Sequence, residues 1–344
     1  MNTLNDRKVP QLTPNHRRQP ENINYLFHFH QTVPVIYRDG LPVGPESILF
    51  EKEDTVYSTV STDIGVYMLK QSRTGQELGI SQEVVDQQLM GFFNPNMPDL
   101  LAIEEQYGKI TFYDQIHDHV NIVKTFAFVS SVESRSLIGT LMDYPAFGCV
   151  EQYCVQSPPD DEMVILWAYQ LAKALKYCHT QHKIVHGDIR PSNIFVFNHN
   201  YVKLANFVYW SPLSQEKQWI SFEQQLYAAP ETLPHREQVE DPSRFPMCTS
   251  VNRYTFSSDI WSLGMLIYFI KHLRIPNEGV ELARLREQLE EGTRPVLNED
   301  LKPTLKRLIE ACWRTEKRDP SEDILPLEQR RPSASAIMNF LDYN

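Results

Sequence analysis

The stretch 184–207 restricts the fold of this chain more than any other part of its sequence. It contains the tripeptide His-Gly-Asp at 186–188 and an asparagine, Asn193, five residues after the aspartate. Two short apolar runs follow at 194–197 and 201–205, separated by Asn-His-Asn. Apolar runs on either side of Asn-rich turn residues predict a β-hairpin, so a polar loop leads directly into two paired strands.

The hairpin is followed by Asn206, Phe207 and Val208. The stretch therefore resembles the catalytic loop and following strands of the protein kinase family, which read H-R-D-x-x-x-x-N, a hairpin and D-F-G. Gly187 replaces the family's arginine, Asn206 its metal-binding aspartate and Val208 its glycine. The resemblance implies a two-lobed α+β fold, with a small β-sheet lobe that carries the family's helix C and a larger, mainly helical lobe. The three replacements predict a damaged phosphate site.

Composition along the chain predicts three parts. Residues 1–22 are polar, rich in Asn, Pro and Arg, and have no hydrophobic period, which predicts a disordered tail. Residues 23–50 gain aromatic and β-branched residues but are broken by prolines, which favours an extension packed on the small lobe. The resemblance implies that residues 51–344 form a kinase-like domain, with the small lobe at about 51–143 and the large lobe at about 144–344.

Charge and composition argue against several classes of protein. The hydrophobic fraction of 42% is that of a folded globular protein, and a net charge of -11 argues against nucleic acid as the main partner. No apolar run reaches the roughly 18 residues that span a bilayer, and the first residues lack the apolar core of a secretory signal. Five cysteines without CxxC spacing argue against a zinc site or disulfide framework. These features favour an intracellular, cytoplasmic protein.

The segment 56–80 resembles the first three strands of a kinase small lobe. Val66 and Tyr67 align with the V-Y that follows the family's glycine-rich loop. The three glycine positions of that loop then fall on Thr59, Ser61 and Ile64. Side chains there block close approach of the backbone to phosphate. The same alignment puts Ser81 where the family has the lysine that pairs the α- and β-phosphates, so we expect the phosphate cradle to be lost.

The family's helix C is predicted to begin near Asp99, a plausible N-cap after a proline. The run 119–123 resembles the family's H-P-N-I-V, and the usual interval back from it puts Ile110 at the position of the lysine's glutamate partner. An insertion near 91–98 accounts for the unusual length of this region. Both halves of the family's Lys–Glu ion pair are therefore expected to be missing.

A strand over 136–143 is predicted to lead into the adenine-binding hinge. By resemblance, Met142 is the gatekeeper and Asp143, Tyr144 and Pro145 form the hinge, whose backbone groups would face adenine. Pro145 removes one of these donors but does not exclude adenine. The residues expected around a nucleotide are Val66, Ser81, Met142, Asp143, Tyr144 and Asn206.

The resemblance gives roles to four residues of the catalytic region. Asp188 matches the base that accepts the substrate's hydroxyl proton, Asn193 matches the second metal ligand, and Arg190 replaces a lysine near the γ-phosphate. Asn206 stands where an aspartate brings a full negative charge to Mg²⁺, a cation that favours carboxylate oxygen. The metal site of Asn193 and Asn206 is therefore weakened. In the alternative interpretation, Asp188 and Asn193 simply hold the loop in shape by hydrogen bonds.

Other parts of the large lobe match groups that hold the fold together. The run 227–231 resembles the A-P-E end of an activation segment, and Arg331 is the matching partner of Glu231 in a buried ion pair. Asp259 begins a helix, and in the family this aspartate holds the backbone of the catalytic loop. Apolar residues at helical spacing over 165–178 predict an amphipathic helix.

These features together favour a pseudokinase, a kinase-like scaffold or allosteric regulator of a signalling protein that is itself a kinase or another enzyme. No cofactor is required, and ATP could bind with weak or no Mg²⁺. Two insertions, 232–256 and 316–327, are the first candidates for partner contacts.

Two other hypotheses remain open. The chain could be an atypical Ser/Thr kinase that uses Asp188 as base and a relocated cation, such as Lys70 or Lys109. It could also bind a nucleotide as a conformational switch without turnover.

Overall fold

The computed structural model describes residues 35–37, 48–52, 55–62, 65–72, 119–130, 137–207, 222–233, 254–315 and 330–342. The chain divides into two compact units, each described here by itself. The first comprises Met1–Asp118 and Val123–Tyr144, and the second comprises His119–Ile122 and Pro145–Asn344. The predicted tail at 1–22 and the predicted helix C lie outside the described residues.

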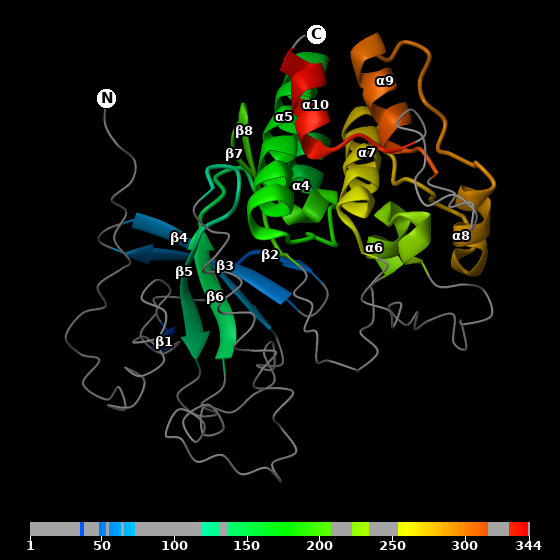
Figure 1. Ribbon diagram of the computed structural model, residues 1–344. Helices are drawn as coiled ribbons and strands as arrows, with labels where there is room; N and C mark the ends of the chain where they lie inside the picture. Colours follow the sequence, from blue (N-terminus) through cyan, green and yellow to red (C-terminus); the bar gives the residue numbers. More distant parts are fainter. Residues whose placement is uncertain are drawn as a thin grey trace. The chain divides into compact units, whose positions relative to one another are not determined.

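The first unit contains a six-stranded sheet (Figure 1). Its strands, in spatial order, are β1 (Val35–Tyr37), β5 (Thr125–Ser130), β6 (Leu137–Asp143), β4 (Gly65–Ser72), β3 (Thr55–Thr62) and β2 (Ile48–Lys52). All neighbouring strands are antiparallel except β1 and β5. Strand β1 and the first three residues of β2 belong to the segment 23–50, so that segment contributes to the sheet.

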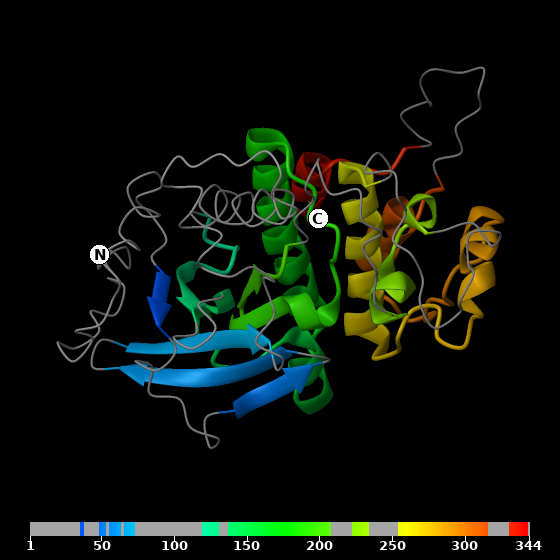
Figure 2. The same ribbon diagram turned by 90° about the horizontal axis from the view of Figure 1, so that it is seen from below.

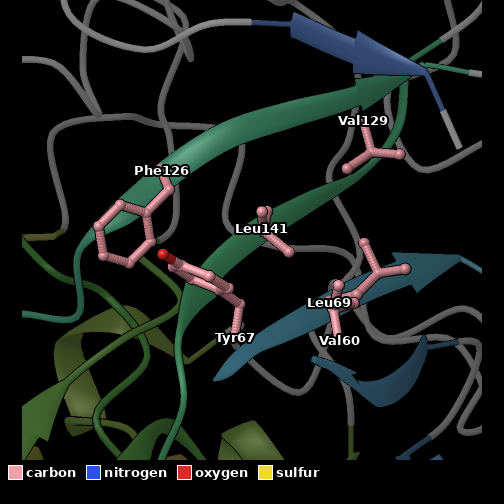
Figure 3. Packing of buried hydrophobic residues seen from close by; sticks show 6 residues of the cluster. All are labelled: Val60, Tyr67, Leu69, Phe126, Val129 and Leu141. Carbon is pink, nitrogen blue, oxygen red and sulfur yellow. The ribbon is translucent and has the colours of Figure 1, made fainter. Parts of the chain in front are cut away.

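The described core of the sheet unit lies on one face of β3, β4, β5 and β6 (Figure 3). Its buried side chains are Val60, Tyr67, Leu69, Phe126, Val129 and Leu141. The rings of Tyr67 and Phe126 meet edge to face, with centroids 5.2 Å apart. Gly139 lets β6 approach β4 closely, because a Cβ there would lie 2.3 Å from the carbonyl oxygen of Lys70. Side chains alternate between the two faces of a strand, so Tyr67 and Leu69, two residues apart on β4, both contribute to this apolar face.

The described strands of the small lobe begin earlier in the chain than the predicted segment 56–80. Strands β2, β3 and β4 form an antiparallel meander, visible as three neighbouring blue ribbons in Figure 2. These three strands cover 48–72 rather than 56–80, and the third, β4, carries Lys70. Strand β4 pairs with β3 on one edge and with the hinge strand β6 on the other, which leaves no room for another strand between β4 and β6. The chain has two V-Y pairs, at 56–57 and 66–67, so its sequence is compatible with two registers of these strands.

The second unit is mainly helical (Figure 1). Its α-helices are α4 (Val150–Gln156), α5 (Asp161–Lys176), α6 (Phe222–Tyr227), α7 (Phe256–His272), α8 (Leu282–Glu290), α9 (Pro303–Cys312) and α10 (Ala334–Asp342). A π-helical turn, η4 (Tyr177–His182), continues α5, and short 3₁₀ turns occur at η5 (Pro191–Asn193) and η6 (Pro230–Thr232). The two-stranded sheet of β7 (Ile194–Asn198) and β8 (Tyr201–Leu204) confirms the predicted hairpin.

Helices α5 and α7 build the core of this unit. Helix α5 packs against α10, α7 and β8, and α7 also packs against α9. The predicted helix over 165–178 is present but begins at Asp161, because the side chain of Asp160 accepts a hydrogen bond from the backbone of Met163 and caps it. Most residues of α7 from Ser258 onward are buried, as expected of a helix enclosed on all sides.

The α+β fold of a sheet unit and a mainly helical unit agrees with the predicted class. Among the described helices, none is both long and apolar enough to cross a bilayer.

Candidate functional site

His186 fixes the start of the catalytic loop from inside the helical unit. Its side chain is fully buried, its Nε2–H donates to the carbonyl oxygen of Ala205 at 2.9 Å, and its Nδ1 accepts from the backbone N–H of Asp188 at 3.1 Å. The ring also lies against Phe207, with centroids 4.4 Å apart. Burial lowers the pKa of His186, so the ring is neutral and its proton sits on Nε2. His186 thereby ties the loop to the end of the hairpin.

Asp259 holds the same loop from the first turn of α7. Its buried carboxylate accepts from the backbone N–H groups of His186 at 2.8 Å and Gly187 at 2.9 Å, and it lies 2.8 Å from Nε2 of His179. Gly187 has φ +80°, a left-handed conformation that side chains disfavour. A glycine at this position therefore lets the loop bend without strain.

Asp188 is the centre of a polar cluster on the loop. Nε of Arg190 lies 2.9 and 3.2 Å from its two carboxylate oxygens, and Nδ2 of Asn193 donates to the carboxylate at 2.7 Å. The same Nδ2 lies 2.8 Å from the carbonyl oxygen of Asp188. The structure therefore brings together the three predicted catalytic residues, and their polar groups bind one another.

Asn206 completes the cluster from the other side of the hairpin. Its backbone is left-handed, with φ +58°, a conformation that asparagine tolerates. Its Nδ2–H donates to Oδ1 of Asn193 at 3.0 Å. Oδ1 is the atom with which Asn193 would coordinate a metal ion. In this structure an N–H group of Asn206 points at that atom instead. Together with the missing carboxylate, this arrangement does not fit Mg²⁺, which prefers anionic oxygen ligands.

Away from the catalytic loop, the described part of the chain contains no cluster of metal-binding side chains. Within these ranges, no three His, Cys, Asp or Glu side chains group closely enough to hold a metal ion.

Of the predicted hinge residues, Asp143 forms hydrogen bonds within the sheet unit, to the backbone of Lys124. Met142 and Asp143 are buried at the end of β6. The backbone N–H of Asp143 donates to the carbonyl oxygen of Lys124 at 3.0 Å, and its carboxylate accepts from the N–H of Lys124 at 3.2 Å. Tyr144 follows as the last residue of the unit, and Pro145 has no N–H to offer a ligand.

Glu231 and Arg331 form a bidentate ion pair in the helical unit. Nη1 and Nη2 of Arg331 lie 2.5 and 3.0 Å from the two carboxylate oxygens of Glu231. The Arg331 side chain is completely buried, while that of Glu231 is partly exposed. Arg331 also donates to the carbonyl oxygens of Ser257 and Arg314, and its guanidinium lies over the ring of Trp261. Through Arg331, the pair links the A-P-E segment to helix α7, which carries Ser257 and Trp261.

Comparison with known proteins decides the family. The family model for the protein kinase domain matches residues 103–324, well over half of the chain. The chain belongs to the protein kinase family.

Three curated relatives agree with that membership. A putative mitogen-activated protein kinase kinase kinase 7-like protein of Drosophila melanogaster is 26% identical over 245 residues, which cover 68% of this chain and 54% of the relative. The tyrosine-protein kinase SRK3 of Spongilla lacustris is 24% identical over 71% of this chain and 66% of the relative. A putative serine/threonine-protein kinase/receptor, R818 of Acanthamoeba polyphaga mimivirus, is 23% identical over 63% of this chain and 12% of the relative. The matches thus span at most two thirds of these kinases.

One lysine of the sheet unit, Lys70, lies on the strand next to β6. Lys70 lies on β4, directly opposite Thr140 of β6, and Met68 lies opposite Met142, the predicted gatekeeper. The kinase pattern V-A-I-K places its lysine at the end of a short apolar run, and the run at 67–70 has this form. Lys70 thus lies on the third strand of the described meander, whereas the sequence alignment gave the position of the family's lysine to Ser81. Ser81 lies outside the described residues.

Two of the three residues predicted at the family's glycine positions lie within a strand. Thr59 and Ser61 lie inside β3, paired with Met68 and Val66, rather than in a loop. Val66 itself is exposed on β4. Ile64, Ile110 and Lys109 are not among the described residues.

Sequence reasoning also missed a contact of the catalytic loop. Nη1 of Arg190 lies 2.5 Å from Oε2 of Glu223, on α6. No local pattern in the sequence indicates that these two residues meet, because they are far apart along the chain and belong to separate segments.

Proposed function

We propose that this chain is a catalytically inactive member of the protein kinase family, a scaffold or allosteric regulator of a protein partner in signalling. The hydrogen bond from Nδ2 of Asn206 to Oδ1 of Asn193 carries the proposal. In an active site both side chains would offer oxygen to a metal ion. Here one presents a hydrogen-bond donor to the other, and neither carries a negative charge.

The expected consequence for phosphoryl transfer is large. Catalysis of this reaction depends on positioning and on charge stabilisation by bound cations. Removing one preorganised electrostatic contact commonly costs about 10²–10³-fold in rate. The polar groups of Asp188, Arg190 and Asn193 also bind one another, which is sufficient to keep the loop in shape without a substrate.

The retained scaffold supports a role in binding. Asp259 and the Glu231–Arg331 pair both support the shape of the helical unit. A protein that acts by its surface needs these ties and does not need a metal. The proposed partner is a kinase or another signalling enzyme, the proposed compartment is the cytoplasm, and no cofactor is required.

One observation favours a second function, that of an atypical Ser/Thr kinase. Lys70 lies on the strand beside the hinge strand and could supply the cation for the phosphates. Asp188 keeps a carboxylate at the position of the family's base. In this alternative the metal site would work with amide ligands alone.

Titration of the purified chain with ATP, followed by thermal unfolding, separates these functions. We expect no rise in melting temperature with ATP, with or without Mg²⁺ or Mn²⁺. A rise that needs no metal would indicate a nucleotide-dependent switch instead. A metal-dependent rise together with phosphate transfer to a protein substrate would establish the kinase. In that case Lys70→Met should reduce both the rise and the transfer, and Asp188→Ala should abolish the transfer. Lys302→Met, which removes an exposed ion pair with Glu162, is the matched control.

A further inference from the structure

Helix α6 is attached to the catalytic loop at two neighbouring residues. Oε2 of Glu223 lies 2.5 Å from Nη1 of Arg190, and Nε2 of Gln224 donates to the carbonyl oxygen of Gly187 at 3.1 Å. The two contacts lie on either side of Asp188 in the loop. A short helix of six residues is therefore held to the segment that carries the kinase family's base.

Arg190 is shared between two carboxylates. Its side chain is 9% exposed, and its guanidinium pairs with Asp188 at 2.9 Å through Nε and with Glu223 through Nη1. A buried guanidinium needs anionic partners, because an uncompensated charge away from water is costly. Of the two partners, the side chain of Glu223 is 25% exposed and that of Asp188 is 11% exposed. Glu223 is thus the partner that solvent and an incoming ligand reach first.

A small pocket lies where α6, α7 and the catalytic loop meet. Residues that line it include Gly187 and Asp188 of the loop, Gln224 and Tyr227 of α6, and Asp259 of α7. Its free space is about that of a single water molecule. Because α6 forms one of its walls, any movement of α6 away from the loop widens it.

We propose that Glu223 is an internal anion that occupies Arg190 and latches α6 onto the catalytic loop. In this arrangement Arg190 accepts an external phosphate group only when the latch is open. The chemical reason is that a guanidinium binds carboxylate and phosphate with the same planar set of donors, so the two compete for it. Opening the latch would expose Arg190 and widen the pocket beside Asp188.

The latch is tested by amide hydrogen exchange on the full chain. In Glu223→Gln, we expect exchange at the α6 amides to rise by about tenfold or more, since a charged hydrogen bond is lost. The control is Glu281→Gln, which removes the partner of Arg284 in an exposed ion pair at α8 and should leave α6 unchanged. Equal exchange of α6 in these two variants would overturn the latch.

Occupancy of Arg190 is tested with inorganic phosphate at constant ionic strength. We expect a saturable rise of a few degrees in the melting temperature of Glu223→Gln, and none in the wild type or in Glu223→Gln/Arg190→Gln. Glu223→Asp keeps the charge and should behave as the wild type. The proposal fails if phosphate raises the wild type equally, if it does nothing to Glu223→Gln, or if the rise persists in the double variant.

The latch does not depend on whether the chain transfers phosphate. Phosphate transfer would refute the proposed function and leave these exchange and phosphate results unaffected. Failure of the latch would leave the Asn193–Asn206 arrangement as it is.

Discussion

Two sides of the catalytic loop differ in how they use charge. On the α7 side, the carboxylate of Asp259 accepts hydrogen bonds from two backbone N–H groups and contacts the ring of His179. On the hairpin side, the position of the family's metal-binding aspartate holds a neutral amide, Asn206, bound to another amide. Charge is thus retained where it holds the loop in shape and lost where it would hold a cation. This difference separates the requirements of a kinase fold from those of kinase chemistry.

Replacement of Arg331 by Met should have the largest effect and tests the scaffold side of this comparison. Arg331 is completely buried and makes an ion pair, two carbonyl contacts and a ring contact. The replacement removes all of these contacts at once but leaves Glu231 with partial access to water, so we expect the free energy of unfolding measured with urea to fall by about 3–4 kcal/mol.

The control for Arg331→Met is Arg284→Gln. Arg284 forms an exposed pair with Glu281 and should change the unfolding free energy by less than about 0.5 kcal/mol. Similar effects of the two replacements would show that the buried pair is not part of the scaffold.

Asp259→Asn should have the next largest effect. An asparagine cannot accept from two backbone N–H groups and a histidine as a carboxylate does, because one of its terminal groups is itself a donor. We expect a loss of about 2–3 kcal/mol in urea unfolding, with faster amide exchange at His186 and Gly187. Wild-type exchange at these amides in the variant would contradict the role given to Asp259.

Acid should weaken the helical unit through His119, whose side chain is partly buried. Burial, with a smaller contribution from Lys173, lowers the pKa of His119 to about 4 from its usual 6.5. Between these pH values the unfolded chain binds more protons, so stability is complete above about pH 6.5 and falls as the pH falls towards 4.

Allowing for partial exposure of His119, its share of this loss is about 1–2 kcal/mol. Urea unfolding at pH 7 and pH 5 measures the loss, and His119→Asn should reduce the difference. An unchanged pH dependence in that variant would exclude His119 as a cause.

Asn206→Gly should have the smallest effect and sharpens the contrast with the scaffold. The variant loses the hydrogen bond to Asn193, but glycine adopts the left-handed conformation of this residue without strain. We expect the unfolding free energy to change by less than about 1 kcal/mol. A loss as large as that of Asp259→Asn would mean that both sides of the loop hold the fold equally.

Local patterns predicted the catalytic loop and its hairpin because their residues are close in sequence. The turn at Asn-His-Asn brings β7 and β8 together, and the short interval from Asp188 to Asn193 lets these two side chains meet. The family resemblance also named Glu231 and Arg331, which the fold brings into contact across a long interval. The direction of the Asn206–Asn193 hydrogen bond could not be read from sequence, since an amide can donate or accept.

The register of the small lobe was harder to predict. Strands β3 and β4 have similar alternating sequences, and only their pairing with β6 shows which of them lies beside the hinge strand. Lys70 was named only as a relocated cation for this reason. The Arg190–Glu223 contact joins separate segments, and single-residue patterns do not encode such long-range pairs.

Binding of Mn²⁺ in the presence of ATP, followed by electron paramagnetic resonance, tests the central claim most directly. Mn²⁺ prefers the same oxygen ligands as Mg²⁺ and its free and bound forms are distinguishable. The amide pair of Asn193 and Asn206 predicts no protein-bound Mn²⁺ beyond the amount that ATP alone binds, and Asn206→Asp should increase that amount. One equivalent of tightly bound Mn²⁺ in the wild-type chain would contradict the claim that this site has lost its metal.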